Sequence, residues 1–280
     1  MIVSRFAPSP TGRLHLGHAY SAVTAHVRAT EAGGRFLVRV EDLDQSRSRP
    51  EFVDAIFEDL GWLGLDWSEP VLVQSRRAAA YSAAIERLRG LGLVYPCFCT
   101  RSDIAAALEA PHGAQGRYPG TCRGVADDPA RRAAEPHSWR LDAAKAIARV
   151  GLPRWSELGQ RFTIAPSEID EVILARKDAP AAYHLACVID DSDSGVTLVV
   201  RGADLRSSTP VQRLLQALLG LAEPDYCHHR LVAHTGGRRL AKRDRAPTLA
   251  AMREAGADGH ALADQLRTGQ LPLGFGWLEA

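Results

Sequence analysis

The first 44 residues carry a strand, helix, strand pattern, and this pattern restricts the fold more than any other feature of the chain. A short apolar segment, "IVSRF", leads through a loop rich in proline and glycine into a helical stretch. A turn and a second apolar segment, "RFLVRV" at residues 35–40, follow. The apolar residues of the helical stretch recur at about 3.6 positions: Ala19, Ala22, Val23 and Val27. Two strands joined by a helix are typical of a parallel sheet, so we predict an α/β fold.

The loop before the first helix is the first candidate site. It reads "PSPTGRLHLGH" and places His15 and His18 at the mouth of the helix. A helix amino terminus has unpaired N–H groups and about half a positive charge, which makes it a ready phosphate site. Gly17 allows a ligand close to the backbone, although lone histidines are more often structural. Because ligands of open α/β sheets bind beyond the carboxyl ends of strands, the loop and Glu41 are expected to face one crevice.

The rest of the chain divides into segments of different composition. Helices are expected near 50–64 and 77–92, and composition changes at "YPCFCTRSD". Residues 95–175 are rich in Pro, Gly and Arg and are predicted to form an insertion with its own small fold. We therefore expect a discontinuous core, 1–94 and 176–235, the insertion at 95–175, and a loop with helices at 236–280.

Regular patterning is expected again after the insertion. A strand is predicted at Val196 to Arg201, followed by a helix with Thr209 as its cap and Pro210 in its first turn. A last strand is predicted at "RLVAH", residues 230–234, and the remaining residues are expected to be mostly helical.

Charge and composition exclude some classes of protein. The chain of 280 residues has 34 basic and 33 acidic residues, so no global field attracts it to nucleic acid. Local basic clusters are more often solvated faces than polyanion sites; these are Arg76 and Arg77, Arg131 and Arg132, and the run Arg238, Arg239, Lys242, Arg243 and Arg245. The start of the chain does not read as a secretion signal and no apolar run reaches the length of a membrane span, which predicts a soluble cytoplasmic protein.

Three of the five cysteines crowd into the predicted insertion. Cys97, Cys99 and Cys122, together with Tyr118, offer three sulfurs and a phenol. Zinc prefers four ligands in a tetrahedron, but a Cys-x-Cys pair is not the usual spacing and tyrosine is not the usual fourth ligand. His112 is a rival fourth ligand, and reduced cysteines without a metal are the other alternative. Cys187 and Cys227 are expected to be ordinary core or near-surface residues.

A basic loop late in the chain completes the candidate site. In "TGGRRLAKRDRAP", Lys242 lies on a segment that contains glycine and could reach over the crevice. A lysine there would offset charge on a transferring phosphoryl group. Histidines, a helix terminus and this lysine together indicate nucleotide activation.

These residues carry a resemblance to a known family. "HLGH" resembles the HIGH signature of class I aminoacyl-tRNA synthetases, and "RRLAKRD" resembles their KMSKS loop. "RFAPSPTGRLHLGH", "RVEDLD" and "VVRGADL" are similar to the glutamyl and glutaminyl branch, and the resemblance covers most of residues 1–250. It implies a Rossmann-like catalytic domain with a small zinc-containing insertion and a short C-terminal helical segment.

Within that branch the chain ends where anticodon-binding domains would begin. This short form with a cysteine-containing insertion is similar to the glutamyl-queuosine tRNA(Asp) synthetases, which join glutamate to the modified wobble base queuosine. The loop departs from the family signature at Arg239 and Ala241, where Lys and Ser are preferred, so Lys242 is the principal matching cation and slower activation is possible.

The resemblance implies three sets of site residues. The ATP set is Pro8, His15, Gly17, His18 and Lys242, of which His15, His18 and Lys242 are the catalytic residues. The glutamate set is Arg5, Ala7, Ser9, Glu41, Tyr183 and Arg201, and the zinc set is Cys97, Cys99, Tyr118 and Cys122. ATP with magnesium would be a substrate complex, zinc would be structural, and the partners would be glutamate and the aspartate tRNA that carries queuosine. A monomer without membrane contact is expected.

The chemistry of an acidic amino acid agrees with the glutamate set. Free glutamate has one ammonium and two carboxylates, so its site needs an acid and one or two arginines, which bind carboxylate bidentately. Glu41 would hold the ammonium, while Arg5 and Arg201 would bind a carboxylate, which favours glutamate over glutamine. Tyr183 would supply a wall and a hydroxyl. For each arginine, the alternative is a surface ion pair.

The expected activity is ATP-dependent activation of glutamate and its transfer to queuosine in the anticodon. Two rivals remain. A shortened glutamyl-tRNA synthetase would charge the 3' end of tRNA, and a non-catalytic RNA-binding paralogue would keep the fold without the reaction. His15, His18, Lys242 and Glu41 occur together with both arginines, which argues against the paralogue.

Overall fold

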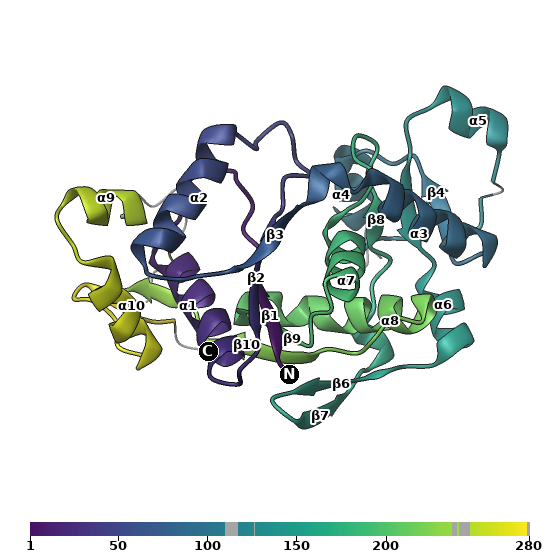
Figure 1. Cartoon of the computed structure of the whole chain (residues 1–280). Helices are drawn as coiled ribbons and strands as arrows, with labels where there is room; N and C mark the ends of the chain where they lie inside the picture. Colours follow the sequence, from purple (N-terminus) through teal and green to yellow (C-terminus); the bar gives the residue numbers. More distant parts are fainter. Residues whose placement is uncertain (110–116, 126, 237–239, 241–246, 279–280) are drawn as a thin grey trace.

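A seven-stranded, mostly parallel sheet forms the centre of the molecule in this computed structural model (Figure 1). The structure describes residues 1–109, 117–125, 127–236, 240 and 247–278, and for Arg101 and 107–109 the backbone only. The strand order is β3-β2-β1-β9-β10-β6-β7, and every neighbouring pair is parallel except β6 with β7. The predicted α/β class is therefore confirmed.

The described elements follow in chain order. The strands are β1 (Val3–Phe6), β2 (Arg35–Val40), β3 (Ser68–Val73), β4 (Val94–Cys97), β5 (Ser138–Leu141), β6 (Arg154–Glu157), β7 (Gln160–Thr163), β8 (Ile173–Ala175), β9 (Leu198–Gly202), β10 (Asp225–His229), β11 (Val232–His234) and β12 (Phe275–Trp277). The α-helices are α1 (Leu16–Thr30), α2 (Pro50–Trp62), α3 (Ala78–Gly90), α4 (Arg101–Glu109), α5 (Pro129–Ala134), α6 (Ala143–Val150), α7 (Tyr183–Asp193), α8 (Thr209–Leu219), α9 (Leu249–Glu254) and α10 (Gly259–Arg267). Short 3₁₀ turns are η1 (Gln74–Arg76), η2 (Pro166–Glu168) and η3 (Ala203–Ser208).

Both faces of the central sheet are buried, as parallel sheets require. Side chains alternate along β9, so Leu198 and Val200 join the core under α1 and α2, while Val199 joins the core under α7 and α8. The two apolar clusters are thus separated by the sheet itself. This sandwich fixes the carboxyl ends of β1, β2 and β9 at one edge.

Most predicted elements occur, with shifts at their ends. The strand at residues 35–40 and the helix after His18 are confirmed as β2 and α1. The strand predicted from Val196 begins at Leu198 and continues to Gly202. Thr209 is not the cap of α8: Ser208 occupies that position, and Thr209 is the first helical residue. The hydroxyl of Thr209 is engaged by Arg201 instead.

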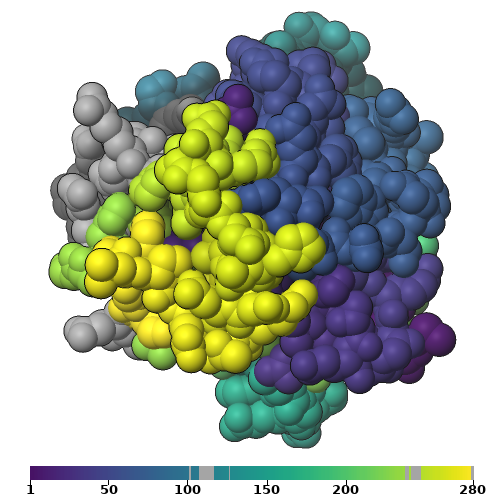
Figure 2. Space-filling view, turned by 60° about the vertical axis from the view of Figure 1, so that its left-hand side comes forward, coloured from purple at the N-terminus to yellow at the C-terminus, as the bar shows by residue number. Residues whose placement is uncertain are grey.

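The last predicted strand is also revised. Residues 232–234 form β11, which pairs with the later strand β12, and the preceding strand β10 was not predicted. The remaining residues contain α9 and α10, which agrees with a mostly helical end. In Figure 2 the yellow C-terminal residues lie against the purple N-terminal segment, and α10 packs on α1.

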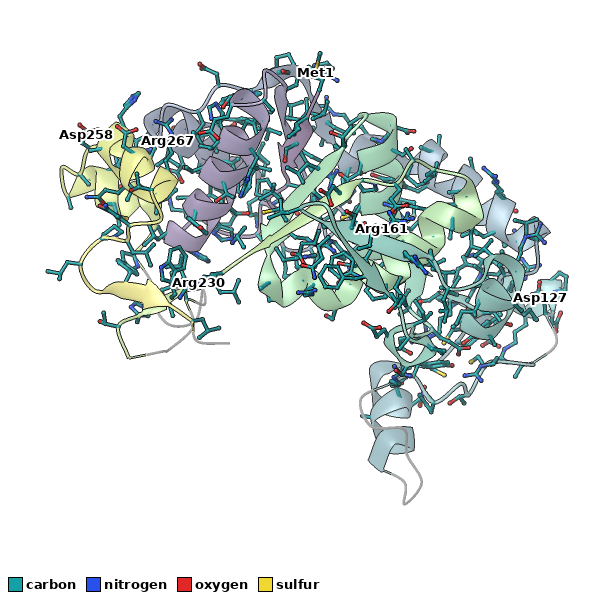
Figure 3. All side chains as sticks on the ribbon, turned by 90° about the horizontal axis from the view of Figure 1, so that it is seen from below. Met1, Asp127, Arg161, Arg230, Asp258 and Arg267 are labelled. Atoms are coloured by element: carbon teal, nitrogen blue, oxygen red, sulfur yellow. The ribbon has the colours of Figure 1, made fainter. Side chains whose placement is uncertain are left out.

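Residues 95–175 contribute to two different sheets. Strands β4, β5 and β8 form a separate antiparallel sheet. Strands β6 and β7 extend the central sheet instead, because β6 pairs with β10. Seen from below, Asp127 lies at the end opposite the C-terminal helices with Asp258 and Arg267, whereas Arg161 of β7 lies nearer the middle (Figure 3). Among the described residues no helix is long and apolar enough to cross a membrane.

Candidate active site

One cavity of about 390 Å³ lies at the carboxyl edge of the central sheet. Its walls come from β1 and the loop after it, the start of α1, and the ends of β2, β9 and β10. Every predicted ATP or glutamate residue that the structure describes lines this cavity: Arg5, Ala7, Pro8, Ser9, His15, Gly17, His18, Glu41, Tyr183 and Arg201. The segments that supply them lie up to 196 positions apart in sequence, between Arg5 and Arg201, and only the sheet brings them together.

Two histidines cap the first turn of α1. Nδ1 of His15 accepts a hydrogen bond from the Gly17 N–H at 3.1 Å, and Nδ1 of His18 accepts one from the His15 N–H, also at 3.1 Å. The rings lie 3.8 Å apart between centroids. An acceptor nitrogen carries no hydrogen, so the hydrogen of each neutral imidazole is on Nε2. The histidines therefore cap the helix through Nδ1 and carry their hydrogen on Nε2.

Gly17 is required by this cap. A Cβ at position 17 would lie 3.1 Å from Cε1 of His15 and 3.2 Å from its Nδ1, which is closer than most Cβ contacts. Any side chain would push the imidazole away from the helix start. Glycine here serves the histidine as well as any ligand close to the backbone.

A buried ion-pair network lies directly behind the cavity. Asp191 accepts hydrogen bonds from Nε of Arg5 at 2.9 Å and from Nη2 of Arg5 at 3.2 Å, and its Oδ1 also pairs with Nη1 of Arg39. Burial by itself would raise the pKa of Asp191, but the charges of Arg39 and Arg5 outweigh burial and lower this pKa to about 2. Asp191 therefore stays ionised and fixes both guanidinium groups.

Glu41 is held by the same network. Its Oε1 accepts from Nη2 of Arg39 at 3.0 Å and from the Cys187 thiol at 3.4 Å. Among the described residues no donor contacts Oε2. Cys187, expected to be an ordinary core residue, is buried but lines the cavity. Burial and the charge of Glu41 raise the pKa of the Cys187 thiol well above its usual range, so it remains a neutral donor.

Four side-chain acceptors hold the guanidinium of Arg201. Its Nη1 donates to Oε1 of Gln212 at 2.7 Å and to the Tyr183 hydroxyl at 3.4 Å. Its Nη2 donates to the Thr209 hydroxyl at 2.8 Å, and its Nε donates to Nε2 of His228 at 3.2 Å. Arg201 is 4 % exposed. No acidic side chain among the described residues neutralises its charge directly.

The predicted basic loop is only partly described. Lys242, Arg239 and Ala241 lie outside the described residues, and so does the rest of the basic run. Of the other basic clusters, Arg131 pairs with Glu135 and Arg132 with Asp127 at the surface, whereas Arg77 pairs with the fully buried Asp190 as well as with Asp193.

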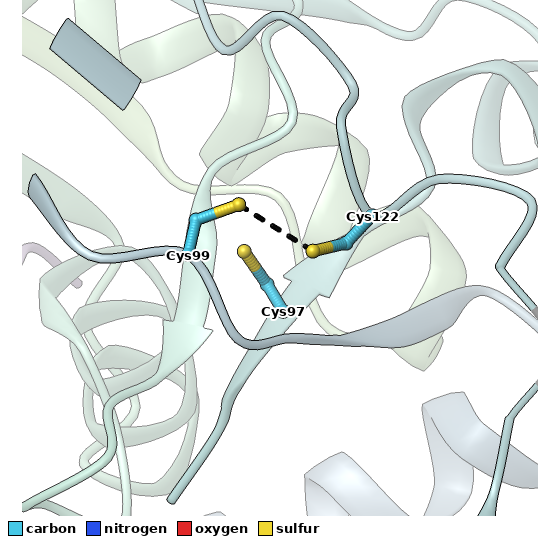
Figure 4. Close-up of side chains that lie close together, drawn as sticks. All are labelled: Cys97, Cys99 and Cys122. Carbon is cyan, nitrogen blue, oxygen red and sulfur yellow. Dashed lines mark hydrogen bonds between the residues drawn. The ribbon is translucent and has the colours of Figure 1, made fainter. Parts of the chain in front are cut away.

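Three cysteine sulfurs gather beside β4 (Figure 4). The Sγ atoms of Cys97, Cys99 and Cys122 lie within 4.8 Å of one another, with 3.4 Å between Cys99 and Cys122. The hydroxyl of Tyr118 lies 3.4 Å from the sulfur of Cys97 and 3.5 Å from that of Cys99. A tetrahedral zinc ion with Zn–S of about 2.3 Å and Zn–O of about 2.0 Å separates sulfur from oxygen by about 3.5 Å. The donor set thus fits such an ion. The rival ligand His112 lies outside the described residues.

A buried arginine accompanies this cluster. Nε of Arg140 donates to the sulfur of Cys97 at 3.3 Å, and its guanidinium carbon lies 3.7 Å from the ring centre of Tyr118. The Cys122 N–H donates to the Tyr118 oxygen at 3.0 Å. The two hydrogen bonds, to the sulfur of Cys97 and to the oxygen of Tyr118, favour the anionic forms of these atoms, which are the forms that bind a metal.

Sequence reasoning missed the residues behind the cavity wall. Arg39 had a usable signal, because strand residues two apart share a face and Glu41 follows it by two. Asp191 and His228 had none, since nothing near them in sequence indicates that they meet Arg5 or Arg201.

Comparisons with known proteins agree with this geometry. The family described as tRNA synthetases class I (E and Q), catalytic domain, matches residues 1–269. A glutamyl-Q tRNA(Asp) synthetase of Rhodobacter capsulatus is 43% identical over 269 residues, which cover 91% of this chain and 96% of that protein. One from Nocardia farcinica is 48% identical over 255 residues, covering 90% of this chain and 79% of that protein.

A solved structure shares the fold. The glutamate-tRNA synthetase of Elizabethkingia anophelis superimposes with a TM-score of 0.79 at 24% identity, covering 95% of this chain and 61% of that chain. The chain thus belongs to the class I tRNA synthetases of the glutamyl and glutaminyl branch, and within them to the glutamyl-Q tRNA(Asp) synthetase family.

Proposed function

We propose that the chain activates glutamate with ATP and transfers the glutamyl group to queuosine in the anticodon of aspartate tRNA. One observation carries this proposal: a single cavity joins a helix start capped by two histidines to two buried arginines, Arg5 and Arg201, and to Glu41, which Arg39 holds from behind the wall. The relatives named glutamyl-Q tRNA(Asp) synthetases supply the acceptor.

The charges of the cavity select an acidic amino acid. Arg5 and Arg39 pair with Asp191 and Glu41, and although Asp204 also lines the cavity, no acidic side chain among the described residues pairs directly with the buried Arg201. Free glutamate has a net charge of −1 and glutamine has none. A buried uncompensated charge is costly, so glutamate completes the site and glutamine leaves it unpaired.

The amino acid is held at both of its polar ends. Glu41 receives the ammonium through Oε2, while its Oε1 stays bonded to Arg39. Arg201 and Arg5 offer N–H groups to a carboxylate, and Tyr183 adds its hydroxyl. Held in this way, the α-carboxylate is free to react with ATP.

Activation then needs positioning and electrostatics only. A carboxylate oxygen of glutamate attacks the α-phosphorus of ATP, and the bond from that phosphorus to the β-phosphate oxygen breaks to release pyrophosphate with its magnesium. The Nε2–H groups of His15 and His18 donate to the phosphate oxygens, and Lys242 offsets the charge of the leaving group. In the second step a hydroxyl of queuosine attacks the glutamyl carbonyl, loses its proton, and releases AMP.

A zinc ion held by Cys97, Cys99, Tyr118 and Cys122 has a structural role in this proposal. Four protein ligands leave no open position for substrate, which is typical of structural zinc. Such an ion ties the segment after β4 to residues 118–122 and shapes the surface that faces the RNA.

Pyrophosphate exchange and the position of the label test the function. Glutamate-dependent ATP–pyrophosphate exchange is measured with and without tRNA, and labelled glutamate is then located after nuclease digestion. Exchange without tRNA and label on an anticodon nucleoside are expected. Replacing Lys242 by Ala is expected to depress exchange strongly, with Lys145→Ala, an exposed residue of α6, as the control.

Other outcomes distinguish the rivals. Label on the terminal adenosine would show a shortened glutamyl-tRNA synthetase. Absence of exchange under all conditions would favour a non-catalytic RNA-binding paralogue. A normal exchange rate in Lys242→Ala would remove the role given to the basic loop.

A further inference from the structure

The Nε–H of Arg201 has an unusual partner. It donates to Nε2 of His228, at 3.2 Å, rather than to a carboxylate. A guanidinium can only donate hydrogen bonds, so Nε2 of His228 must be an acceptor and carry no hydrogen. The hydroxyl of Thr209, which accepts from Arg201, lies 3.3 Å from the same Nε2 and can turn its hydrogen toward it.

Glu157 fixes this state of the imidazole. Its Oε1 accepts from Nδ1 of His228 at 2.8 Å and from the His228 N–H at 2.9 Å. Because the hydrogen is held at Nδ1 by the carboxylate, the lone pair of Nε2 points to Arg201. A carboxylate, an imidazole and a guanidinium thus form one chain of oriented donors and acceptors.

Charged neighbours keep the imidazole neutral. Burial and the charge of Arg201 lower the pKa of His228 to about 4, although Glu157 opposes this shift. The groups that face the chain from the surrounding elements are few. Arg206 of η3 pairs with the other oxygen of Glu157 at 3.3 Å, Tyr226 stacks on His228 from β10, and Tyr183 of α7 contacts Arg201.

The hydrogen-bond chain from Glu157 through His228 to Arg201 joins two parts of the fold. Glu157 ends β6, within residues 95–175, whereas His228 belongs to β10 and Arg201 to β9 of the central sheet. β6 pairs in parallel with β10, which brings the end of β6 beside His228. The segment that includes the cysteine cluster thus also supplies Glu157, which contacts the cavity residue Arg201 through His228.

We propose that Glu157 and His228 are positioning residues, which orient the Arg201 guanidinium so that its remaining Nη2–H meets the carboxylate of glutamate. This inference rests on the proposed function, because it assumes that Arg201 binds glutamate. Neither residue touches the substrate. Their loss therefore weakens glutamate binding and leaves ATP binding and the chemical step largely intact.

Steady-state exchange kinetics of paired variants test the proposal. Glu157→Ala and His228→Leu each break the hydrogen-bond chain. Glu157→Gln keeps an acceptor for the Nδ1–H of His228, and His228→Gln keeps an oxygen acceptor for Arg201. The first pair is expected to raise KM for glutamate by about tenfold to hundredfold, since a hydrogen bond to a charged group is lost. KM for ATP is expected to stay within about twofold, and the glutamine variants are expected to recover most of the glutamate affinity.

Glu223→Ala is the matched control. Glu223 also pairs across this region, with Arg161 and Arg213, but does not contact His228. Its loss is expected to leave KM for glutamate unchanged. If Glu157→Ala and His228→Leu raise KM for glutamate and KM for ATP equally, the hydrogen-bond chain stabilises only the fold. The same conclusion would follow if neither glutamine variant recovers the affinity for glutamate.

The state of His228 in the unmodified protein is measured separately. Long-range ¹H–¹⁵N spectra at pH 7 are expected to show a neutral imidazole with its hydrogen on Nδ1. A hydrogen on Nε2 would overturn the proposal, whatever the kinetics. If the unmodified chain shows no exchange at all, the proposed function fails, and the ¹⁵N spectra still decide whether the oriented chain exists.

Discussion

At the scale of single residues, this site depends on side chains whose own hydrogen bonds are satisfied before any ligand arrives. Four protein acceptors hold the guanidinium of Arg201, and Asp191 holds that of Arg5 from behind. Such groups lose little rotamer freedom on binding, so more of the interaction with a carboxylate appears as affinity.

Arg201→Lys is predicted to weaken glutamate binding although the positive charge is kept. A lysine ammonium cannot reach Gln212, Thr209 and His228 in one plane, so three acceptors lose their fixed partner. KM for glutamate in the exchange assay is expected to rise at least about tenfold. Arg161→Lys, on the exposed strand β7, is the control and should behave like the unmodified protein.

Cys97→Ser is predicted to remove a stoichiometric metal ion. Serine is a poor zinc ligand, and three remaining donors do not complete a tetrahedron. Metal content is measured by elemental analysis of purified protein, with Cys227→Ser, a buried cysteine away from the cluster, as the control. Tyr118→Phe is expected to bind zinc more weakly than the unmodified protein. Full zinc content in Cys97→Ser would contradict the ligand set.

At the scale of elements, the start of α1 combines a structural and a chemical role in the same two side chains. The imidazole of His15 caps the helix through Nδ1, so it substitutes for the Ser, Thr, Asp or Asn that usually caps a helix. One backbone N–H of the first turn, that of Gly17, donates to this cap. Because this N–H already donates to His15, we expect an anion at the start of α1 to be bound more by the Nε2–H groups of His15 and His18 than by the backbone.

Two variants of His15 are predicted to separate these roles. Asn can cap the helix but has no donor at the position of Nε2, so His15→Asn should keep its melting temperature and lose exchange activity. His15→Ala loses the cap as well and is expected to be destabilised by about 1 kcal/mol. Thermal unfolding followed by circular dichroism measures the stability. Equal melting temperatures for both variants would show that the cap does not stabilise the helix.

Elements also show the limits of pattern reasoning. The βαβ start was predictable because a helical stretch with apolar residues at about 3.6 positions lies between two short apolar segments. Strands β6 and β10 were not, since neither has a clear alternation and the residues that pair between them are 69 positions apart, as Ser156 and Asp225 are. Thr209 was misjudged as a cap because a threonine before proline resembles one, whereas here the buried Arg201 captures its hydroxyl.

At the scale of the whole molecule, an ion pair ties the last helices to the first half of the chain. Nη1 of Arg253 in α9 donates to Oδ1 of Asp59 in α2 at 3.0 Å, across 194 positions. Asp59 is fully buried, and its Oδ2 has no partner among the described residues. Burial raises the pKa of Asp59 to about 6, although Arg253 opposes the shift.

This raised pKa predicts a pH dependence of stability. The folded state holds the proton of Asp59 more tightly than the unfolded chain, so this group stabilises the fold less as the pH rises from about 4 to about 6. Between pH 4.5 and 7.5 the loss amounts to about 2 kcal/mol. Asn cannot ionise, so the stability of Asp59→Asn should not show this decrease between pH 4.5 and 7.5.

Urea unfolding of both proteins at pH 4.5 and 7.5 measures the difference. The free energy of unfolding of Asp59→Asn minus that of the unmodified protein is the quantity compared. It is expected to be about 2 kcal/mol larger at pH 7.5 than at pH 4.5. A difference that does not change with pH would show that Asp59 keeps an ordinary pKa.

The sequence alone predicted the α/β class, the two histidines at the start of the first helix, and Arg5, Arg201 and Glu41, because periodicity and the motifs that carry the family resemblance lie within short stretches. Tertiary structure decided what lies behind them. Asp191 meets Arg5 and Arg39 because α7 packs on the central sheet, and Glu157 reaches Arg201 through His228 because parallel strands distant in sequence lie side by side in that sheet. Contacts of this kind depend on strand order and register, which no local pattern records.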